Sequence, residues 1–189
     1  MLATFLRTSQ VIPRRIGLFV DYENLLPLLP ARLRTRPKEV GDILVQYASR
    51  FGDVVCRWAC ADHRNIPDAD GMSEGFEQAG FQVQFPRGET GRLDPPSKNI
   101  TDFVVLERIT FEATHSKPDI YILVSGDGDF FERIMGLLEQ KNNVRLAASA
   151  SNMASKYRRL EQKSRRSLLP EGYGDFFIDN LDQILGVKV

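Results

Sequence analysis

Two stretches of sequence decide the fold, Ile16-Gly-Leu-Phe-Val-Asp21 and Leu123-Val-Ser-Gly-Asp-Gly-Asp-Phe130. Each is part of a continuous apolar run, which is typical of a strand buried on both faces of a parallel sheet. Each run then ends at polar residues, at Asp21 in the first and at Ser125 in the second. We therefore expect two inner parallel strands that place aspartates at one edge of a sheet.

Strand-like and helix-like segments alternate along the rest of the chain. Short apolar runs predict strands, and apolar residues with helical spacing predict helices. The predicted strands cover 16–20, 54–61, 81–85, 119–124, 144–148 and 176–178, and the predicted helices cover 39–51, 72–79, 100–114, 127–140 and 153–166. This alternation implies an α/β protein with a mostly parallel, five- or six-stranded sheet between helices.

Length and composition fit one domain. The chain has 189 residues, and its 25 Lys+Arg balance its 25 Asp+Glu, which argues against a purely electrostatic nucleic-acid binder. We expect residues 1–15 to be a flexible extension, with three arginines and no acid, and residues 16–189 to form the domain. No stretch is long and apolar enough to span a membrane, so a cytoplasmic location is expected.

The cysteines, Cys56 and Cys60, lie four positions apart in a predicted strand. Four residues of strand span about 13 Å, which is too far for a disulfide. Buried thiols are the plain interpretation. A zinc site with His63 is the alternative, although the strand spacing is poor and a fourth ligand is missing.

The aspartates form a pattern when placed on the predicted sheet. Asp21 ends the first strand, Asp127 and Asp129 follow the fourth, and Asp102 lies in the first turn of the helix over 100–114. Ligands of open parallel sheets bind beyond the carboxyl ends of the strands. If the first and fourth strands are neighbours, these carboxylates converge and repel one another, and Mg²⁺ or Mn²⁺ would relieve the repulsion. A divalent ion there lowers the pKa of bound water and stabilises displacement at phosphorus.

Each of these side chains also has a structural alternative. Asn24 and Asp127 could cap helices, and Asp102 could complement the positive end of its helix. Capping does not, however, require acids after apolar strands at one edge. Two other acids lie nearby: Glu23 could join an outer shell of the metal, and Glu107 is expected to be exposed or salt-bridged.

These residues carry a family resemblance. Segment 16–25 resembles the opening motif of NYN domains, the LabA-like branch of the PIN-like nucleases, and segment 123–130 resembles its Ser-Gly-Asp-x-Asp-Phe motif. Segments 98–102 and 174–181 are similar to its central and closing motifs. The resemblance implies a three-layer PIN-like (Rossmann-like) fold and metal-dependent ribonuclease activity. It implies catalytic, metal-holding roles for Asp21, Asp102, Asp127 and Asp129, and accessory roles for Asn24 and Ser125.

The sequence departs from the family at two places. The segment Lys98-Asn-Ile-Thr-Asp102 is one residue longer than the usual lysine-to-aspartate segment. Arg108 stands near the position where the family often has a second acid on that helix. Both departures predict a centre that binds fewer ions or binds them more weakly.

RNA needs cationic surface beside an anionic centre. The favoured contacts are Arg87, Arg92 and Lys98, on the irregular loop that leads into Asp102. Tyr22 and Phe85 could stack bases, although core packing is the preferred interpretation of Phe85. Further candidate cations are Arg32, Arg34, Arg36, Lys156, Arg158, Arg159, Lys163, Arg165 and Arg166.

The favoured hypothesis is a metal-dependent ribonuclease with RNA as its partner, and apolar residues near the end would allow a homodimer. One alternative is a non-catalytic module that binds RNA or a protein. The other is a haloacid-dehalogenase-like phosphatase, but that family needs aspartate two residues after the nucleophile, where this chain has Glu23 after Asp21.

Overall fold

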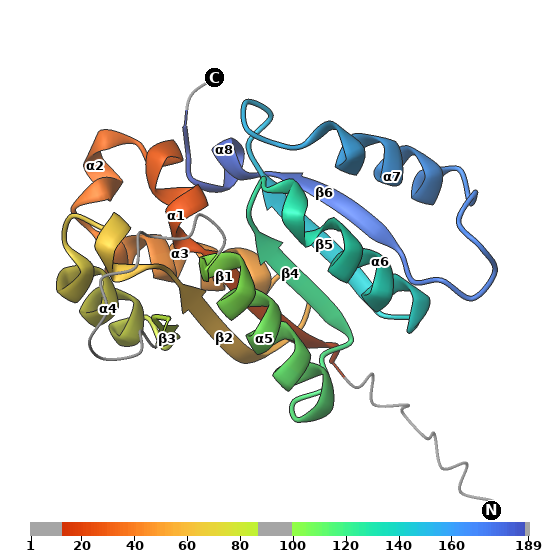
Figure 1. The fold of residues 1–189 in the computed structure, drawn as a ribbon, viewed down its shortest axis with the longest axis horizontal. Coiled ribbons are helices and arrows are strands. Elements are labelled where there is room, and N and C mark those ends of the chain that lie inside the picture. Colours follow the sequence, from red (N-terminus) through yellow and green to blue (C-terminus); the bar gives the residue numbers. More distant parts are fainter. Residues whose placement is uncertain (1–12, 87–99, 188–189) are drawn as a thin grey trace, which may run out of the picture.

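The computed structural model describes residues 13–86 and 100–187, which form a parallel sheet with helices on both faces (Figure 1). The described part contains a six-stranded sheet in the order β3-β2-β1-β4-β5-β6, and all its neighbouring strands run parallel. The strands are β1 (Arg15–Asp21), β2 (Asp53–Cys60), β3 (Gln82–Gln84), β4 (Ile120–Val124), β5 (Asn143–Ala148) and β6 (Phe176–Asn180). The predicted fold class is confirmed.

The helices divide between the two faces of the sheet. One face is covered by α1 (Tyr22–Leu25), α2 (Ala31–Arg34), α3 (Pro37–Ala48), α4 (Ala69–Gln78) and α8 (Leu181–Ile184). The other is covered by α5 (Ile100–Thr114), α6 (Phe131–Glu139) and α7 (Ser155–Arg165). In Figure 1, α5 and α6 lie in front of the sheet and α7 lies beside β6. Three 3-10 turns join these elements in the described segments: η1 (Leu26–Leu28), η2 (His63–Asn65) and η3 (Gly128–Phe130).

The inner strands β1 and β4 are buried on both faces, as their continuous apolar runs predict. On β1, Leu18 and Val20 pack into the core under α3, while Phe19 packs into the core under α5. On β4, Ile122 and Leu123 divide in the same way. Because side chains alternate along a strand, a run without polar residues is what two apolar layers require.

The strand order reverses between β1 and β4. The chain leaves β1 toward β2 and β3 on one side, and it leaves β4 toward β5 and β6 on the other. The two strands pair directly from Ile16↔Ile120 to Val20↔Val124, which confirms the predicted adjacency. At such a switch point the connections diverge beyond the carboxyl ends of the strands and leave a crevice for ligands.

Four of the five predicted helices differ from the structure in their bounds. The helices expected over 39–51 and 153–166 are Pro37–Ala48 and Ser155–Arg165, and the other two differ at their amino ends for reasons that the hydrogen bonds show. The helix expected over 127–140 is the 3-10 turn η3 followed by α6, because the side chain of Asp127 accepts a hydrogen bond from the Asp129 N–H and holds a tighter turn there. The helix expected over 72–79 begins at Ala69, because the side chain of Asp68 caps it through the Gly71 N–H.

The two cysteines lie on β2 and are free and buried, which confirms that interpretation. They alternate with Trp58 in the core between β2 and α5, and Trp58 is buried as expected. Within the two described segments, no helix combines the length and apolar character needed to cross a membrane.

Candidate metal centre

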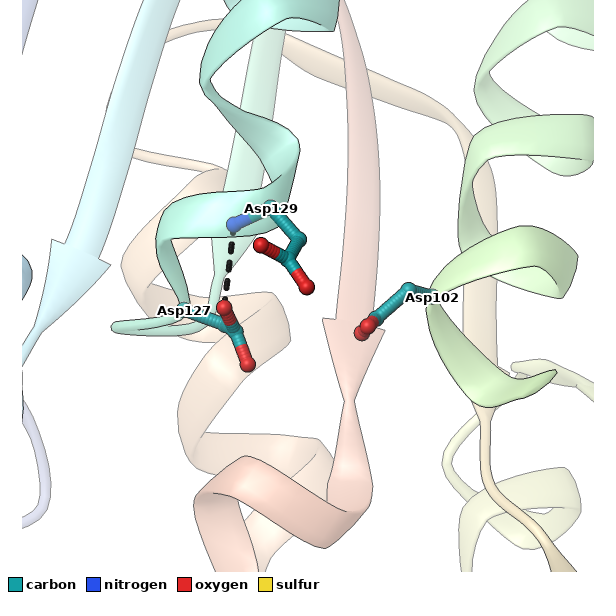
Figure 2. A group of neighbouring side chains, drawn as sticks. All are labelled: Asp102, Asp127 and Asp129. Atoms are coloured by element: carbon teal, nitrogen blue, oxygen red, sulfur yellow. Dashed lines mark hydrogen bonds between the residues drawn. The ribbon is translucent and has the colours of Figure 1, made fainter. Parts of the chain in front are cut away.

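Three aspartates converge at the switch point of the sheet. Asp102, Asp127 and Asp129 each offer a carboxylate oxygen, and these oxygens lie within 4.8 Å of one another. Figure 2 shows Asp102 reaching from the start of α5 toward the turn after β4, where Asp127 and Asp129 lie. Segments far apart in the sequence therefore supply one acidic group, which contains three of the four acids that we expected to converge.

The turn after β4 is held by hydrogen bonds from its own polar residues. The Asp127 carboxylate accepts from the Asp129 N–H at 2.9 Å, and the Asp127 N–H donates to the Ser125 hydroxyl oxygen at 3.1 Å. The Tyr157 hydroxyl of α7 donates to the Asp127 carbonyl. Asp127 thus caps η3 and belongs to the acidic group at the same time, which fixes the spacing of the two acids.

Asp21 lies close to this group but has a different environment. The three residues whose oxygens approach within 4.8 Å do not include it. It is only 3% exposed, and its two oxygens accept from the Asn24 N–H at 3.2 Å and from the Ser125 hydroxyl at 3.0 Å. Burial raises the pKa of Asp21 to about 7, and the charges of Asp102 and Glu23 add to the effect. A direct ligand role for Asp21 stays a prediction.

Asn24 links the ends of three strands rather than capping a helix. Its side-chain oxygen accepts from the Gly126 N–H at 2.8 Å and from the Asn152 side-chain amide at 2.9 Å. A Cβ on Gly126 would come within 2.8 Å of the Asn152 backbone carbonyl oxygen, so the turn requires glycine there. Asn152 was not predicted. Its position just after β5, at the carboxyl edge of the sheet, is the signal that could have found it.

Glu23 anchors the start of α5. Its carboxylate accepts from the Asp62 N–H at 2.5 Å, from the Asn65 side-chain amide at 2.7 Å and from the Thr101 hydroxyl. Since Thr101 immediately precedes Asp102, Glu23 sets where Asp102 begins its reach into the centre. Glu107 by contrast pairs with Arg108 at 3.0 Å, which confirms the expected salt bridge.

The acidic group suits a hard divalent cation. Burial is the main cause that raises the pKa of Asp102 to about 6. The negative charges of Asp127, Asp129 and Glu23 raise it further. Among the described residues no hydrogen-bond donor contacts the carboxylates of Asp102 and Asp129, so these oxygens are available as ligands. Ligand oxygens around Mg²⁺ lie at about 2.1 Å from the ion and hence up to roughly 4.2 Å apart. Oxygens within 4.8 Å need only a small inward movement to meet that geometry.

The predicted RNA contacts Arg87, Arg92 and Lys98 lie outside the described residues. Of the other candidates, Arg32 and Arg36 both pair with Glu39, at 3.7 and 3.3 Å. Arg34 donates to backbone carbonyls of the segment before it. Tyr22 is buried, so it offers no face to a base.

The zinc alternative finds no support. Among the described residues, no group of potential ligands includes either cysteine. Burial raises the pKa of the Cys56 thiol to about 12, and it raises the pKa of Cys60 as well. Zinc binds thiolates, and burial works against their formation here.

The model of the NYN domain family matches residues 15–165 of the chain. The chain belongs to the NYN family. NYN domains are part of the PIN-like nuclease superfamily, and the matched region contains every acid of the centre. The resemblance noted for segment 174–181 lies beyond the match and stays a prediction.

The fold of this NYN protein has a relative among solved structures. A crystal structure of a protein of unknown function from Vibrio parahaemolyticus superposes with a TM-score of 0.62 at 20% sequence identity. The match covers 90% of this chain and 95% of the other, and it supports the fold alone. A comparison with curated protein sequences gave no match.

Proposed function

We propose that this NYN protein is a metal-dependent ribonuclease that hydrolyses RNA phosphodiester bonds, with Mg²⁺ or Mn²⁺ as its cofactor. The observation that carries the proposal is the group of three carboxylates, supplied by α5 and by the turn after β4, within 4.8 Å of one another at the switch point of the sheet. Membership of a nuclease superfamily agrees with this chemistry.

The residues of the centre divide the work. Asp102, Asp127 and Asp129 would hold the ion, and Asp21 would complete the acidic centre from its buried position. Bound Mg²⁺ or Mn²⁺ would supply activation of water and neutralise charge on the phosphate. Ser125 donates to Asp21 and accepts from the Asp127 N–H. It therefore connects the buried Asp21 to the turn that carries Asp127 and Asp129.

A phosphatase that uses Asp21 as a covalent nucleophile fits the site less well. Both oxygens of Asp21 are engaged by hydrogen bonds, and the side chain is 3% exposed. Glu23 contacts Thr101 of α5, Asn65 of η2 and the backbone of Asp62 just before η2, so it is not placed to act as the partner acid of such a nucleophile.

The test is cleavage of end-labelled single-stranded RNA by the full chain, in Mg²⁺, in Mn²⁺ and in EDTA. We expect cleavage in either metal and none in EDTA. Asp127→Asn should reduce the rate by at least about a hundredfold, because it removes a charged ligand while it keeps the shape of the turn. Mn²⁺ binding, followed by calorimetry, should weaken in parallel.

Asp70→Asn is the matched control, since Asp70 is exposed on α4. It makes the same chemical change outside the centre and should leave cleavage and Mn²⁺ binding intact. Cleavage that persists at the wild-type rate in Asp127→Asn would defeat the proposal. RNA binding without cleavage or metal affinity would instead favour the non-catalytic module.

A further inference from the structure

A groove of about 640 Å³ lies between α6 and α7, close to the acidic centre. Its apolar lining, which we call the floor, includes Phe131 and Met135 from α6 and Leu160 from α7, and Tyr173 lines the groove as well. Leu168 on its rim is 64% exposed, a large fraction for a leucine. The described residues that line it include no acid. We call it the α6–α7 groove.

Three cations of α7 line the same groove: Lys156, Arg159 and Lys163. They follow one another at helical spacing, so they form a row along one face of the helix. The row spans eight residues, and its first and last members are about 10 Å apart along the helix. Arg159 and Lys163 are exposed, and within the described part of the chain none of the three makes an ion pair. Arg165, by contrast, pairs with Glu161.

The row of cations begins at the acidic centre itself. Lys156 lies across Gly128, the residue between Asp127 and Asp129: a Cβ there would meet its Cε at 2.9 Å and its Nζ at 3.3 Å. The Lys156 ammonium also lies 5.0 Å from the centre of the Phe131 ring. The α6–α7 groove therefore starts where the metal-holding turn ends, and its cations lead away from that turn.

We propose that the α6–α7 groove binds a single-stranded segment of RNA whose adjoining phosphodiester lies at the acidic centre. The inference rests on the proposed ribonuclease function, and it identifies the path of the substrate. A row of unpaired cations tracks a phosphate backbone, and an apolar floor with aromatic residues accommodates unstacked bases. A duplex would keep its bases stacked and away from that floor.

Charge complementarity favours RNA over a protein segment. The groove has cations along one wall, and it is continuous with the acidic centre. The proposed substrate of that centre carries a negative charge at every phosphate. Arg32 and Arg36, on the other side of the sheet, already share Glu39. The α7 row thus provides cations beside the centre that form no ion pair with the described acids.

The experiment measures binding in EDTA, so that cleavage does not enter. Fluorescence anisotropy would follow a short, labelled single-stranded RNA on the full chain and on the double variant Arg159→Glu, Lys163→Glu. We expect the dissociation constant to rise at least about tenfold. The slope of log affinity against log salt should become shallower by the amount expected for the loss of about two phosphate contacts. Circular dichroism and thermal melting would verify that both proteins are folded.

The matched control is the double variant Arg158→Glu, Arg166→Glu, which makes the same charge change on and just after α7 at positions that do not line the groove. Equal loss of binding in both variants would overturn the inference, because it would show only general electrostatic attraction. Unchanged binding in the groove variant would overturn it too, and so would equal affinity for duplex RNA. Binding of a labelled acidic amphipathic peptide that the groove variant loses, in a protein that does not bind the RNA, would overturn it as well and would assign the groove to a protein.

The two proposals can fail separately. If RNA binding depends on the groove but no cleavage occurs in Mg²⁺ or Mn²⁺, the ribonuclease function falls and the groove assignment stands. If RNA is cleaved but the groove variant binds it normally, the substrate follows another path and the groove assignment falls.

Discussion

The proposed role of Asp21 conflicts with the stability of the fold, because an ionised Asp21 would serve the acidic centre but is unfavourable where it is buried. A carboxyl buried at 3% exposure, near Asp102 and Glu23, is held in an unfavourable environment when ionised. Its pKa is raised from 3.8 to about 7, so the folded protein binds a proton that the unfolded chain has released near neutral pH. Such a group stabilises the fold at low pH, and this contribution is lost as the pH rises toward 7.

Asp21→Asn should therefore stabilise the metal-free protein. The amide is uncharged and similar in shape, and it removes a penalty on the order of 3 kcal/mol at neutral pH. In EDTA we expect a higher melting temperature at pH 7.5, by several degrees, and a difference from wild type that shrinks as the pH falls toward 4. Thermal unfolding across that pH range measures it, with Asp70→Asn as the exposed control.

The same variant should lose cleavage activity while it gains stability. A drop in stability at pH 7.5, with Mn²⁺ absent, would contradict the view that Asp21 is held against its preference. A stability gain that does not depend on pH would place its origin in packing rather than in charge.

Residues next to the strands could be predicted, and residues that act through tertiary contacts could not. Asp127 follows an apolar run, so its place at the sheet edge is visible in the sequence. Asn152 has no local pattern around it, and its importance arises only because β5 lies beside β4 and Gly126 leaves room for it. Glu23 was noted as a nearby acid, but the hydrogen bond that it accepts from the Thr101 hydroxyl depends on where α5 begins.

At the scale of elements, the start of α5 positions Asp102. The Thr101 hydroxyl donates to the Glu23 carboxylate, which also accepts from the backbone N–H of Asp62, just after the end of β2. The side chain of Thr101 is buried at 5% exposure. The first turn of α5 is thus tied to two strand ends, and this contact determines how closely Asp102 approaches Asp127.

Thr101→Val should loosen that first turn while all the acids are kept. Valine has the shape of threonine but cannot donate to Glu23, so we expect faster hydrogen exchange at the start of α5. Mn²⁺ affinity should fall about tenfold, as is usual when a residue that orients a ligand is lost. Thr110→Val on the exposed side of the same helix is the control. Normal Mn²⁺ affinity together with faster hydrogen exchange would contradict the prediction, because it would mean that the position of Asp102 does not affect metal binding.

Helix limits show the same division between local and tertiary signals. The helix over 100–114 was predicted with its observed bounds, although two of its apolar residues, Phe103 and Phe111, are exposed. The turn η3 was missed because its geometry comes from one side-chain hydrogen bond at Asp127. Composition alone does not distinguish a capping aspartate from the first residue of a helix.

At the scale of the whole molecule, the last segments close both cores. The family match ends at residue 165, yet β6 pairs with β5 along its length and Phe176 packs under α7. On the opposite face, Leu181 and Leu185 are buried against α3 and the sheet. We therefore expect the region beyond the family match to unfold together with the rest of the described fold.

Phe176→Ala should destabilise the whole protein. The ring is fully buried, so its removal leaves a cavity and should lower the free energy of unfolding by about 3–5 kcal/mol. Phe177 is the adjacent residue on β6 and is 36% exposed, so Phe177→Ala should cost clearly less. Urea unfolding, followed by circular dichroism and by Trp58 fluorescence, measures both. Trp58 lies on β2, and three strands separate β2 from β6 in the sheet. Coincident transitions in Phe176→Ala therefore indicate one unit, whereas an unchanged Trp58 transition would mean that β6 unfolds alone.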